Sequence, residues 1–395
     1  MFFSISHQPK ANYSHQYSLG DFNIDTDAGW HEAIVSGCHV LYKGYADSDS
    51  LRSLLPAIIE SSEPQYTGNF CAICLVGEQL IIKTDKWRSF PIYIADGQEI
   101  TNLTAHTTTA WTDSLITINP NLSYIEDKFD SIGNFDFAPL THQEGVQMID
   151  DILTAKTKSF LEHNTLPIKA FMSGGVDSAL TYSYLTKYTS DYTNVVGNYM
   201  EWDEFWMKNS GTLQKNWAYK QIHHWTDDCV LTTGSPGDEF MMRSPNTANM
   251  YLVTHGTSIP QLNVSEENLH YSYYRQAKHL AIFEKHEQDR KDIAVLSESG
   301  RNYAICNIIL NDWQHWHLGK TLTWTPLRDL GIMKILLRMP LTSVKSQIMD
   351  SSISKELMER NYPGISSVIS DQKNTGNALK NLYKFYANID ANFSQ

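Results

Sequence analysis

Short apolar runs punctuated by glycine, aspartate and serine dominate the first part of the chain. Residues 69–76 and 79–85 are two such runs on either side of Gly77-Glu78, which predicts a β-hairpin. Residues 48–61 have instead the amphipathic spacing of a helix. We therefore expect residues 1–118 to form a small β-rich domain.

The pattern changes after a polar stretch at residues 119–142, which we interpret as a linker. Apolar residues recur at helical intervals over 143–162. Short apolar runs at 168–172 and 193–199 then alternate with helical patterns, and this alternation is typical of a parallel sheet covered by helices. The sequence predicts an α/β fold, with a second domain over 143–395.

Composition places the chain among ordinary globular proteins, with 42% hydrophobic and 19% charged residues. Lys and Arg number 31 against 44 Asp and Glu, and an acidic balance argues against a nucleic-acid partner, which requires basic surface. No apolar run approaches the roughly 20 residues of a membrane span. The N-terminus lacks the basic start and apolar core of a signal peptide. We expect a cytoplasmic protein with no membrane partner.

The cysteines are odd in number and scattered among apolar neighbours, which favours reduced thiols. Cys71 and Cys74 have CxxC spacing, but in a strand they would face opposite sides. With no second pair, neither a metal nor a redox role is expected. The five cysteines are Cys38, Cys71, Cys74, Cys229 and Cys306.

The strongest chemical signal lies between the strand at 168–172 and the helical pattern that follows. A glycine turn there allows phosphate oxygens to approach backbone N–H groups at a helix N-terminus. Two serines can add hydroxyl donors, and Asp177 is compatible with phosphates if Mg²⁺ lies between them. The alternative is a turn with a polar helix cap. The candidate phosphate-binding residues, which the resemblance given below assigns to ATP, are Ser173, Gly174, Gly175, Val176, Asp177 and Ser178.

A second strand-turn-carboxylate pattern starts at Cys229. Thr233 and Gly234 follow a short apolar run, and the turn ends in Asp238-Glu239. Two strand ends that each offer an aspartate, Asp177 and Asp238, can share Mg²⁺ bound to a chain of phosphates. Taken alone, Asp238-Glu239 could be a solvated helix start.

The 173–178 stretch resembles the SGGxDS loop of the N-type ATP pyrophosphatases, or PP-loop enzymes, which include asparagine, β-lactam, NAD and GMP synthetases and several tRNA-modifying enzymes. Residues 233–239 resemble the second phosphate-site motif of asparagine synthetases, with Thr233, Asp238 and Glu239 at its Ser, Asp and Glu positions. Ser235 and Pro236 depart from that motif, which normally has Glu and Gly there.

Two later segments resemble the same family. Residues 324–330 are similar to its Pro-Phe-Leu-Asp turn, with Arg328 in place of an apolar residue and Asp329 in a position to cap the next helix. Residues 362–369 are similar to the segment before its catalytic lysine. The resemblance assigns that role to Lys373, and a surface lysine is the alternative.

The N-terminal domain resembles the late part of the glutaminase domain of asparagine synthetase-like proteins, an Ntn-type amidotransferase fold. The similarity covers the 68–76 strand, the strand ending at Asp85 and the 90–94 segment. Such domains use an N-terminal cysteine as nucleophile, whereas position 2 here is Phe2. We expect a truncated domain without glutamine hydrolysis.

The resemblance implies an ATP-dependent ligase of the asparagine synthetase type. A substrate carboxylate would be adenylated and then joined to an amine, with release of AMP and pyrophosphate. The implied cofactors are ATP and Mg²⁺, with Asp177 and Asp238 as metal ligands and Lys373, Asp238 and Glu239 as catalytic residues. The expected partners are small-molecule or peptide carboxylates and amines, and the sequence leaves both a monomer and a homodimer open. The alternatives are a PP-loop enzyme that modifies tRNA or a small molecule, and a non-catalytic nucleotide-binding protein.

Overall fold

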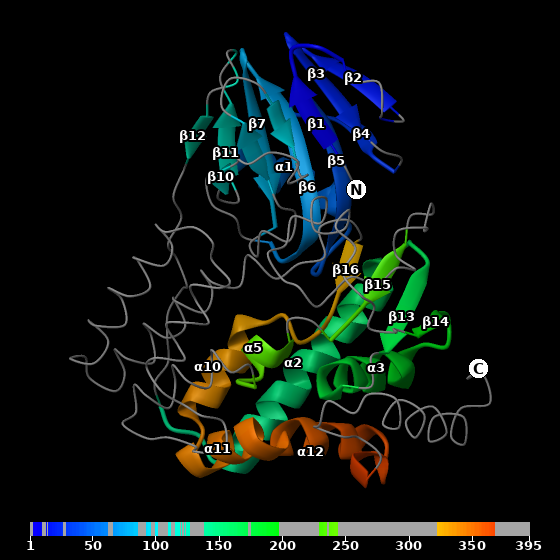
Figure 1. Cartoon of the computed structure of the whole chain (residues 1–395), viewed down its shortest axis with the longest axis vertical. Helices are drawn as coiled ribbons and strands as arrows, with labels where there is room; N and C mark the ends of the chain where they lie inside the picture. The colour runs from blue at the N-terminus through cyan, green and yellow to red at the C-terminus, as the bar shows by residue number, and fades with distance from the viewer. Residues whose placement is uncertain are drawn as a thin grey trace.

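The structure of the chain is a computed structural model. It describes residues 3–9, 13, 15–26, 29–61, 66–85, 92–95, 99–101, 110–111, 115–118, 120, 122, 124–126, 138–172, 175–196, 229–234, 237–243 and 322–367. The described residues form a mixed α/β structure. Two antiparallel sheets lie at the top of Figure 1, and a parallel sheet with its helices lies below them.

The N-terminal part is a sandwich of two six-stranded sheets, with strand orders β10-β8-β9-β1-β3-β2 and β12-β11-β7-β6-β5-β4. The predicted hairpin is confirmed, because β6 and β7 pair across Gly77-Glu78. The second sheet extends through β12, past residue 118, where we expected the domain to end. The strands are β1 Phe3–Ser6, β2 His15–Leu19, β3 Phe22–Thr26, β4 His31–Val35, β5 Cys38–Ala46, β6 Gly68–Val76, β7 Gln79–Thr84, β8 Tyr93–Ala95, β9 Glu99–Thr101, β10 Ala110–Trp111, β11 Leu115–Ile118 and β12 Tyr124–Glu126.

Strand β6 separates two apolar cores because its side chains alternate between the faces of the sheet. Cys71 and Ile73 contribute to the main core, which includes Phe3 and Ile5 of the first sheet. Cys74 lies in a second core, where helix α1 (Leu51–Glu60) covers the outer face of the sheet. The prediction that Cys71 and Cys74 face opposite sides is therefore confirmed.

The C-terminal part contains a four-stranded parallel sheet with strand order β14-β13-β15-β16. The helix predicted over 143–162 is confirmed as α2, which begins at His142. Thr141 is its N-cap, and Thr141 and Glu144 form a reciprocal capping box. The strands are β13 Ile168–Met172, β14 Thr193–Val196, β15 Val230–Thr232 and β16 Leu322–Trp324. The helices are α2 His142–His163, α3 Val176–Tyr188, α5 Gly237–Phe240, α10 Leu330–Arg338, α11 Leu341–Asp350 and α12 Ser352–Asn361, followed by the short 3-10 turn η3 Ile365–Ser367.

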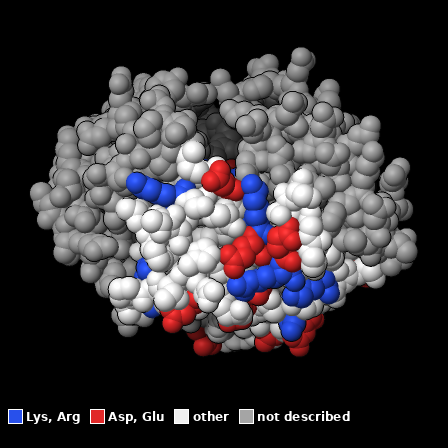
Figure 2. All heavy atoms as spheres, turned by 90° about the horizontal axis from the view of Figure 1, so that it is seen from below, with Lys and Arg blue, Asp and Glu red and all other residues white. Residues whose placement is uncertain are grey.

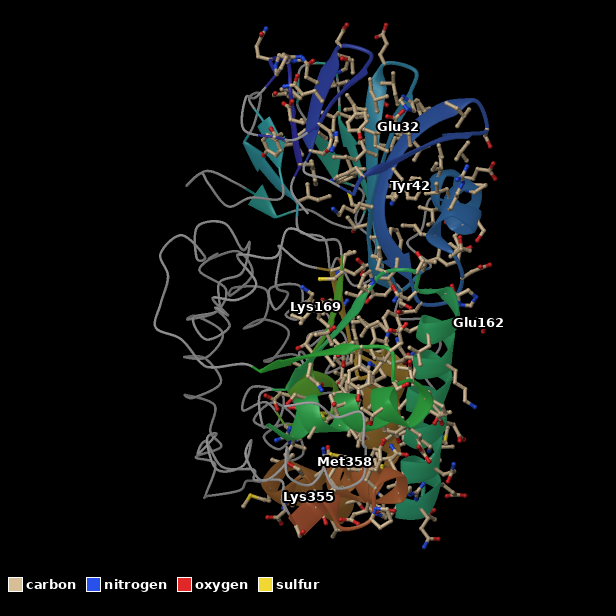
Figure 3. All side chains as sticks on the ribbon, turned by 90° about the vertical axis from the view of Figure 1, so that its right-hand side faces the viewer. Glu32, Tyr42, Glu162, Lys169, Lys355 and Met358 are labelled. Atoms are coloured by element: carbon tan, nitrogen blue, oxygen red, sulfur yellow. The ribbon has the colours of Figure 1, made fainter. Side chains whose placement is uncertain are left out.

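The two parts share one continuous core. Trp324 of β16 stacks on Phe160 of α2 with ring centroids 4.2 Å apart, and Phe160 meets Tyr45 of the sandwich edge-on at 5.6 Å. Figure 3 shows the long helix α2 rising beside the sheet, with Glu162 near the end that meets the sandwich and Lys169 on β13. The row of three rings holds the sandwich against the parallel sheet.

Buried polar contacts join the same two parts. The Tyr45 hydroxyl donates to the backbone carbonyl of Thr323, and Asn69 Nδ2 donates to the Thr323 hydroxyl at 3.3 Å. Arg328, which is 4% exposed, donates to the carbonyl of Gly68 at 3.0 Å and to Thr323 Oγ1 at 3.2 Å. Arg328 is thus a contact between the two parts of the chain. None of the described helices has the length and apolar character to cross a membrane.

Candidate active site

The two glycine turns predicted from the sequence meet at the carboxyl ends of adjacent strands. Strand β13 pairs in parallel with β14 on one side and with β15 on the other. In chain order β14 follows β13 and β16 follows β15, and β14 and β16 lie on opposite sides of the central pair, so the strand order reverses between β13 and β15 (Figure 1). Ligands of open α/β sheets bind in the crevice at such a reversal.

The first turn ends at the N-terminus of α3, a helix of 13 residues. Gly175 is the N-cap, and no side chain caps this helix. The N–H groups of a first helical turn have no acceptor within the helix, and the helix dipole favours an anion beside them. Ser178 is buried and its hydroxyl donates to the carbonyl of Gly175 at 2.9 Å, so in this structure its proton is used inside the turn.

The second turn packs directly on the first. A Cβ on Gly234 would overlap the amide nitrogen of Ser178 and lie 2.8 Å from its Cα. A Cβ on Gly237 would lie 2.8 Å from the Cβ of Asp177. Only glycine leaves room for this approach, so these two glycines bring the second loop onto Asp177.

Arg243 connects the two aspartates that we predicted as metal ligands. Its Nη1 atom donates to Asp177 Oδ2 at 2.6 Å and to Asp238 Oδ1 at 3.1 Å. The side chains of Arg243 and Asp177 are each 13% exposed, whereas Asp238 is 46% exposed. The structure therefore brings both carboxylates to one position, with the guanidinium between them.

Asp177 is in an unfavourable environment for a carboxylate. Burial raises its pKa, Arg243 lowers it and Asp238 raises it again, and the net effect places the pKa well above its usual value. Its Oδ1 atom is buried and accepts no hydrogen bond within the described residues. A buried carboxylate oxygen without a donor, close to a second carboxylate, matches the oxygen ligands that Mg²⁺ prefers. No cluster of three His, Cys, Asp or Glu side chains occurs in the described ranges, so these residues supply two carboxylates at most.

The segment after β16 reaches the same end of the sheet. Thr325 Oγ1 lies 3.0 Å from Thr181 Oγ1 of α3, and a Cβ on Gly237 would meet Leu327 Cδ1 at 2.5 Å. Asp329 accepts from the N–H of Gly331 at 2.7 Å and caps α10, as predicted. Three segments singled out in the sequence thus converge at neighbouring strand ends.

The other predicted site residues divide into two groups. Thr233 and Glu239 are buried, and the Thr233 N–H donates to the carbonyl of Trp324 at 3.0 Å. Ser173, Gly174 and Lys373 lie outside the described residues, as do Ser235 and Pro236. The structure assembles Gly175, Val176, Asp177, Ser178, Thr233, Gly234, Asp238 and Glu239 around the ends of β13 and β15.

Sequence reasoning missed Arg243. It lies three residues beyond α5, and its backbone N–H donates to the carbonyl of Asp238, five residues earlier, at 2.6 Å. That turn aims the arginine back at the carboxylates. The sequence does show a basic residue shortly after Asp238-Glu239. Its contact with Asp177 and Asp238 depends on this local turn, which the sequence pattern does not predict.

The face seen in Figure 2 carries blue and red side chains next to one another among the described residues. On helices α2 and α12, Arg360 contacts Glu356 at 3.1 Å and Asp150 at 3.6 Å, and His142 contacts Glu356 at 2.9 Å. Mixed charges of this kind form local ion pairs rather than a single-sign field.

Comparisons with known proteins give little beyond this geometry. No family model matches the chain, and no curated protein matches it. The solved structures that match include glutamine phosphoribosylpyrophosphate (PRPP) amidotransferase from B. subtilis complexed with ADP and GMP, at 10% identity and a TM-score of 0.22 over 64% of this chain and 72% of that one. Another is described as the allosteric regulatory enzyme of purine biosynthesis, at 8% identity and a TM-score of 0.21 over 54% of this chain and 60% of that one. Similarity this weak carries no argument about the site.

Proposed function

We propose that the protein is an ATP-dependent ligase that adenylates a carboxylate and joins it to an amine. The substrate carboxylate attacks the α-phosphorus of ATP, which forms an acyl-adenylate and releases pyrophosphate. The amine then attacks the acyl carbon, so that an amide forms and AMP leaves. This is the chemistry of the asparagine synthetase-like proteins that the two loops resemble.

One observation carries the proposal: Asp177 and Asp238 come from different loops and converge on a single nitrogen of Arg243. A polyphosphate chain needs donors and a cation at one point, and the crevice between β13 and β15 provides a helix N-terminus and two carboxylates together. A simple polar helix cap would not require a second loop to pack on Asp177, as Gly237 does.

Each of these residues would have a distinct role in the proposed reaction. The N-terminal N–H groups of α3 bind phosphate oxygens, and Gly234 and Gly237 keep the second loop close enough for both loops to contact one ligand. Asp177 and Asp238 would hold Mg²⁺, which when bound neutralises charge on the phosphates. Lys373, placed by sequence resemblance, would stabilise charge on the departing pyrophosphate.

The amine source follows from the N-terminal domain. Its first strand β1 begins at Phe3, and position 2 carries a phenylalanine instead of a cysteine nucleophile. The resemblance places the nucleophile of an active glutaminase domain at this position, so we propose that the N-terminal domain does not hydrolyse glutamine. We therefore propose that the amine is free ammonia, a second substrate or a group on the same molecule.

The test uses full-length protein with ATP, Mg²⁺ and a panel of carboxylates, first with hydroxylamine as a trapping amine. Acyl-adenylates react with hydroxylamine to give hydroxamates, so the expected products are a hydroxamate, AMP and pyrophosphate. Asp177→Asn removes one charge at nearly constant volume and should abolish these products. Release of ADP and phosphate instead would exclude an adenylating ligase.

Asp151→Asn is a matched control. Asp151 is exposed on α2, which belongs to neither loop, and it accepts from Gln147 Nε2 at 2.9 Å. The same chemical change there should leave AMP release at the wild-type level. Equal loss of activity in both variants would mean that Asp177 has no specific role.

A non-catalytic nucleotide-binding protein is the second candidate, and Arg243 favours it. An arginine already neutralises the two carboxylates, so a nucleotide sensor could use this site without a metal. This candidate predicts ATP binding in the absence of divalent cations and no AMP with any carboxylate or amine. The hydroxamate assay and ATP titration with and without EDTA separate the two.

A further inference from the structure

Arg243 lies where a metal shared by Asp177 and Asp238 would lie. Its Nη1 atom is 2.6 Å from Asp177 Oδ2 and 3.1 Å from Asp238 Oδ1. A cation that bridges the same two carboxylates needs direct contact with their oxygens, and the nitrogen fills that space. The guanidinium and a metal that bridges Asp177 Oδ2 and Asp238 Oδ1 are therefore mutually exclusive.

The arginine is held from outside the two loops. Its Nε atom donates to Ser351 Oγ at 2.7 Å, and Ser351 lies between α11 and α12 with a positive φ of 55°. A largely buried guanidinium is costly without anions beside it. Asp238 is 46% exposed, so solvent reaches the pair from the Asp238 side. That side gives an incoming cation access to the two carboxylates.

We propose that Arg243 is an exchangeable counter-ion of the candidate ATP site. It neutralises Asp177 and Asp238 while no divalent cation is bound, and it is displaced when Mg²⁺ and nucleotide enter. The displaced guanidinium then donates to a phosphate oxygen of the nucleotide, the acceptor that its planar donor set fits best. This inference rests on the proposed function, because it assigns a role within the same site.

The proposal makes a pair of predictions that a fixed counter-ion would not produce together. If Arg243 competes with the cation and then moves to the nucleotide, its removal must strengthen divalent-cation binding in the absence of nucleotide and must weaken nucleotide binding, because a phosphate donor is lost. If Arg243 is only a fixed counter-ion, its removal also favours the cation, because a positive charge beside two carboxylates is lost, but nucleotide binding does not weaken.

The experiment measures Mn²⁺ binding to full-length protein from the EPR signal of the free ion, without nucleotide. Arg243→Gln should bind Mn²⁺ about tenfold more tightly than wild type, which corresponds to the loss of one competing charged contact. Arg360→Gln is the matched control, because Arg360 also contacts two carboxylates, those of Asp150 and Glu356, but far from the loops in the sequence. It should retain the wild-type Mn²⁺ affinity.

Calorimetric titration with Mg²⁺ and α,β-methylene ATP tests the second part of the proposal, that the displaced guanidinium contacts the nucleotide. Arg243→Gln should bind this nucleotide about tenfold more weakly, and Arg243→Lys, which keeps the charge, should lose less. If Arg243→Gln does not fold, Ser351→Gly replaces it: a less firmly held guanidinium should also give tighter Mn²⁺ binding. Unchanged or weaker Mn²⁺ binding in a folded variant overturns the exchange, and so does unchanged nucleotide binding.

These outcomes separate the exchange from the ligase activity. Tighter Mn²⁺ binding and weaker nucleotide binding without AMP release from any carboxylate would support the exchange and count against the ligase. AMP release by wild type, together with Mn²⁺ binding unaffected in Arg243→Gln, would support the ligase and overturn the exchange.

Discussion

The backbone of Gly234 lies directly against the amide of Ser178, so that a Cβ on Gly234 would overlap the Ser178 nitrogen. The first residue belongs to the turn after β15 and the second to the first turn of α3. Neither loop can take its position without the other, because backbone meets backbone and no flexible side chain can move aside. The candidate site is therefore one packed unit made of two loops.

Gly234→Ala should separate the loops. The added methyl group must push the turn away from α3, at a cost of about 1–3 kcal/mol for overpacking. We expect a lower denaturant midpoint and a loss of nucleotide affinity in calorimetry. Gly77→Asn is the control: Gly77 has a positive φ of 63°, which asparagine tolerates, and nothing lies within 4 Å of its Cβ position. Equal nucleotide affinity in Gly234→Ala and wild type would contradict the packing argument.

Arg328→Met should destabilise the whole chain. The buried guanidinium donates to the carbonyl of Gly68 and to Thr323 Oγ1, and methionine fills similar volume but leaves both acceptors without this donor. We expect a loss of about 1–3 kcal/mol in the free energy of unfolding, measured by urea denaturation. Arg338→Met removes an exposed contact to the carbonyl of Ala138 and should cost much less. Similar losses in both variants would argue against a special role for the buried contact.

The contribution of Lys156 to the free energy of unfolding should be lost at alkaline pH. Burial alone would lower the pKa of its ammonium, but Asp47 at 3.2 Å and Asp329 at 3.4 Å outweigh burial, and the net shift is upward. A base whose pKa is raised by folding contributes stability below its ordinary pKa of 10.5 and loses it as the pH rises through the folded value.

The matching experiment compares unfolding free energies of wild type and Lys156→Met across the alkaline range. The wild-type advantage should be constant at neutral pH and should shrink above about pH 10.5. Tyrosine ionisation affects both proteins alike and cancels in the difference. A difference that stays flat into strong alkali would show that the Lys156 charge contributes nothing.

The cysteines of β6 should resist alkylation. Burial raises the pKa of the Cys74 thiol to about 11, and burial with Asp85 nearby raises that of Cys71 well above its usual value. Thiols attack as thiolates, so at pH 8 both should react with iodoacetamide far more slowly than in unfolded protein. Cys38 is half-buried and should be labelled before them. Peptide mass spectrometry gives the order, and early labelling of Cys74 would contradict it.

Periodicity was sufficient to predict the hairpin, the parallel strands and the helix starts, because each depends on local sequence. The capping role of Asp329 was equally local. Arg243 and Arg328 could not be assigned, because their partners lie far away in the chain: Asp177 is 66 residues from Arg243, and Gly68 is 260 residues from Arg328. Strand β12 was not predicted, because the stretch around it, which we interpreted as a linker, is polar overall. A short strand at the margin of a sheet has little apolar signal of its own.

The contacts on Thr323 show what the sandwich contributes to the parallel sheet. In the described sheet β16 is an outermost strand, and a strand in that position offers unpaired carbonyls that can recruit another chain. Tyr45 donates to the carbonyl of Thr323, and Asn69 and Arg328 donate to its hydroxyl. The sandwich thereby acts as a shield against edge-to-edge association. A fragment that starts at residue 138 would lose Tyr45 and Asn69, and it should aggregate even where the two loops of the candidate site are intact.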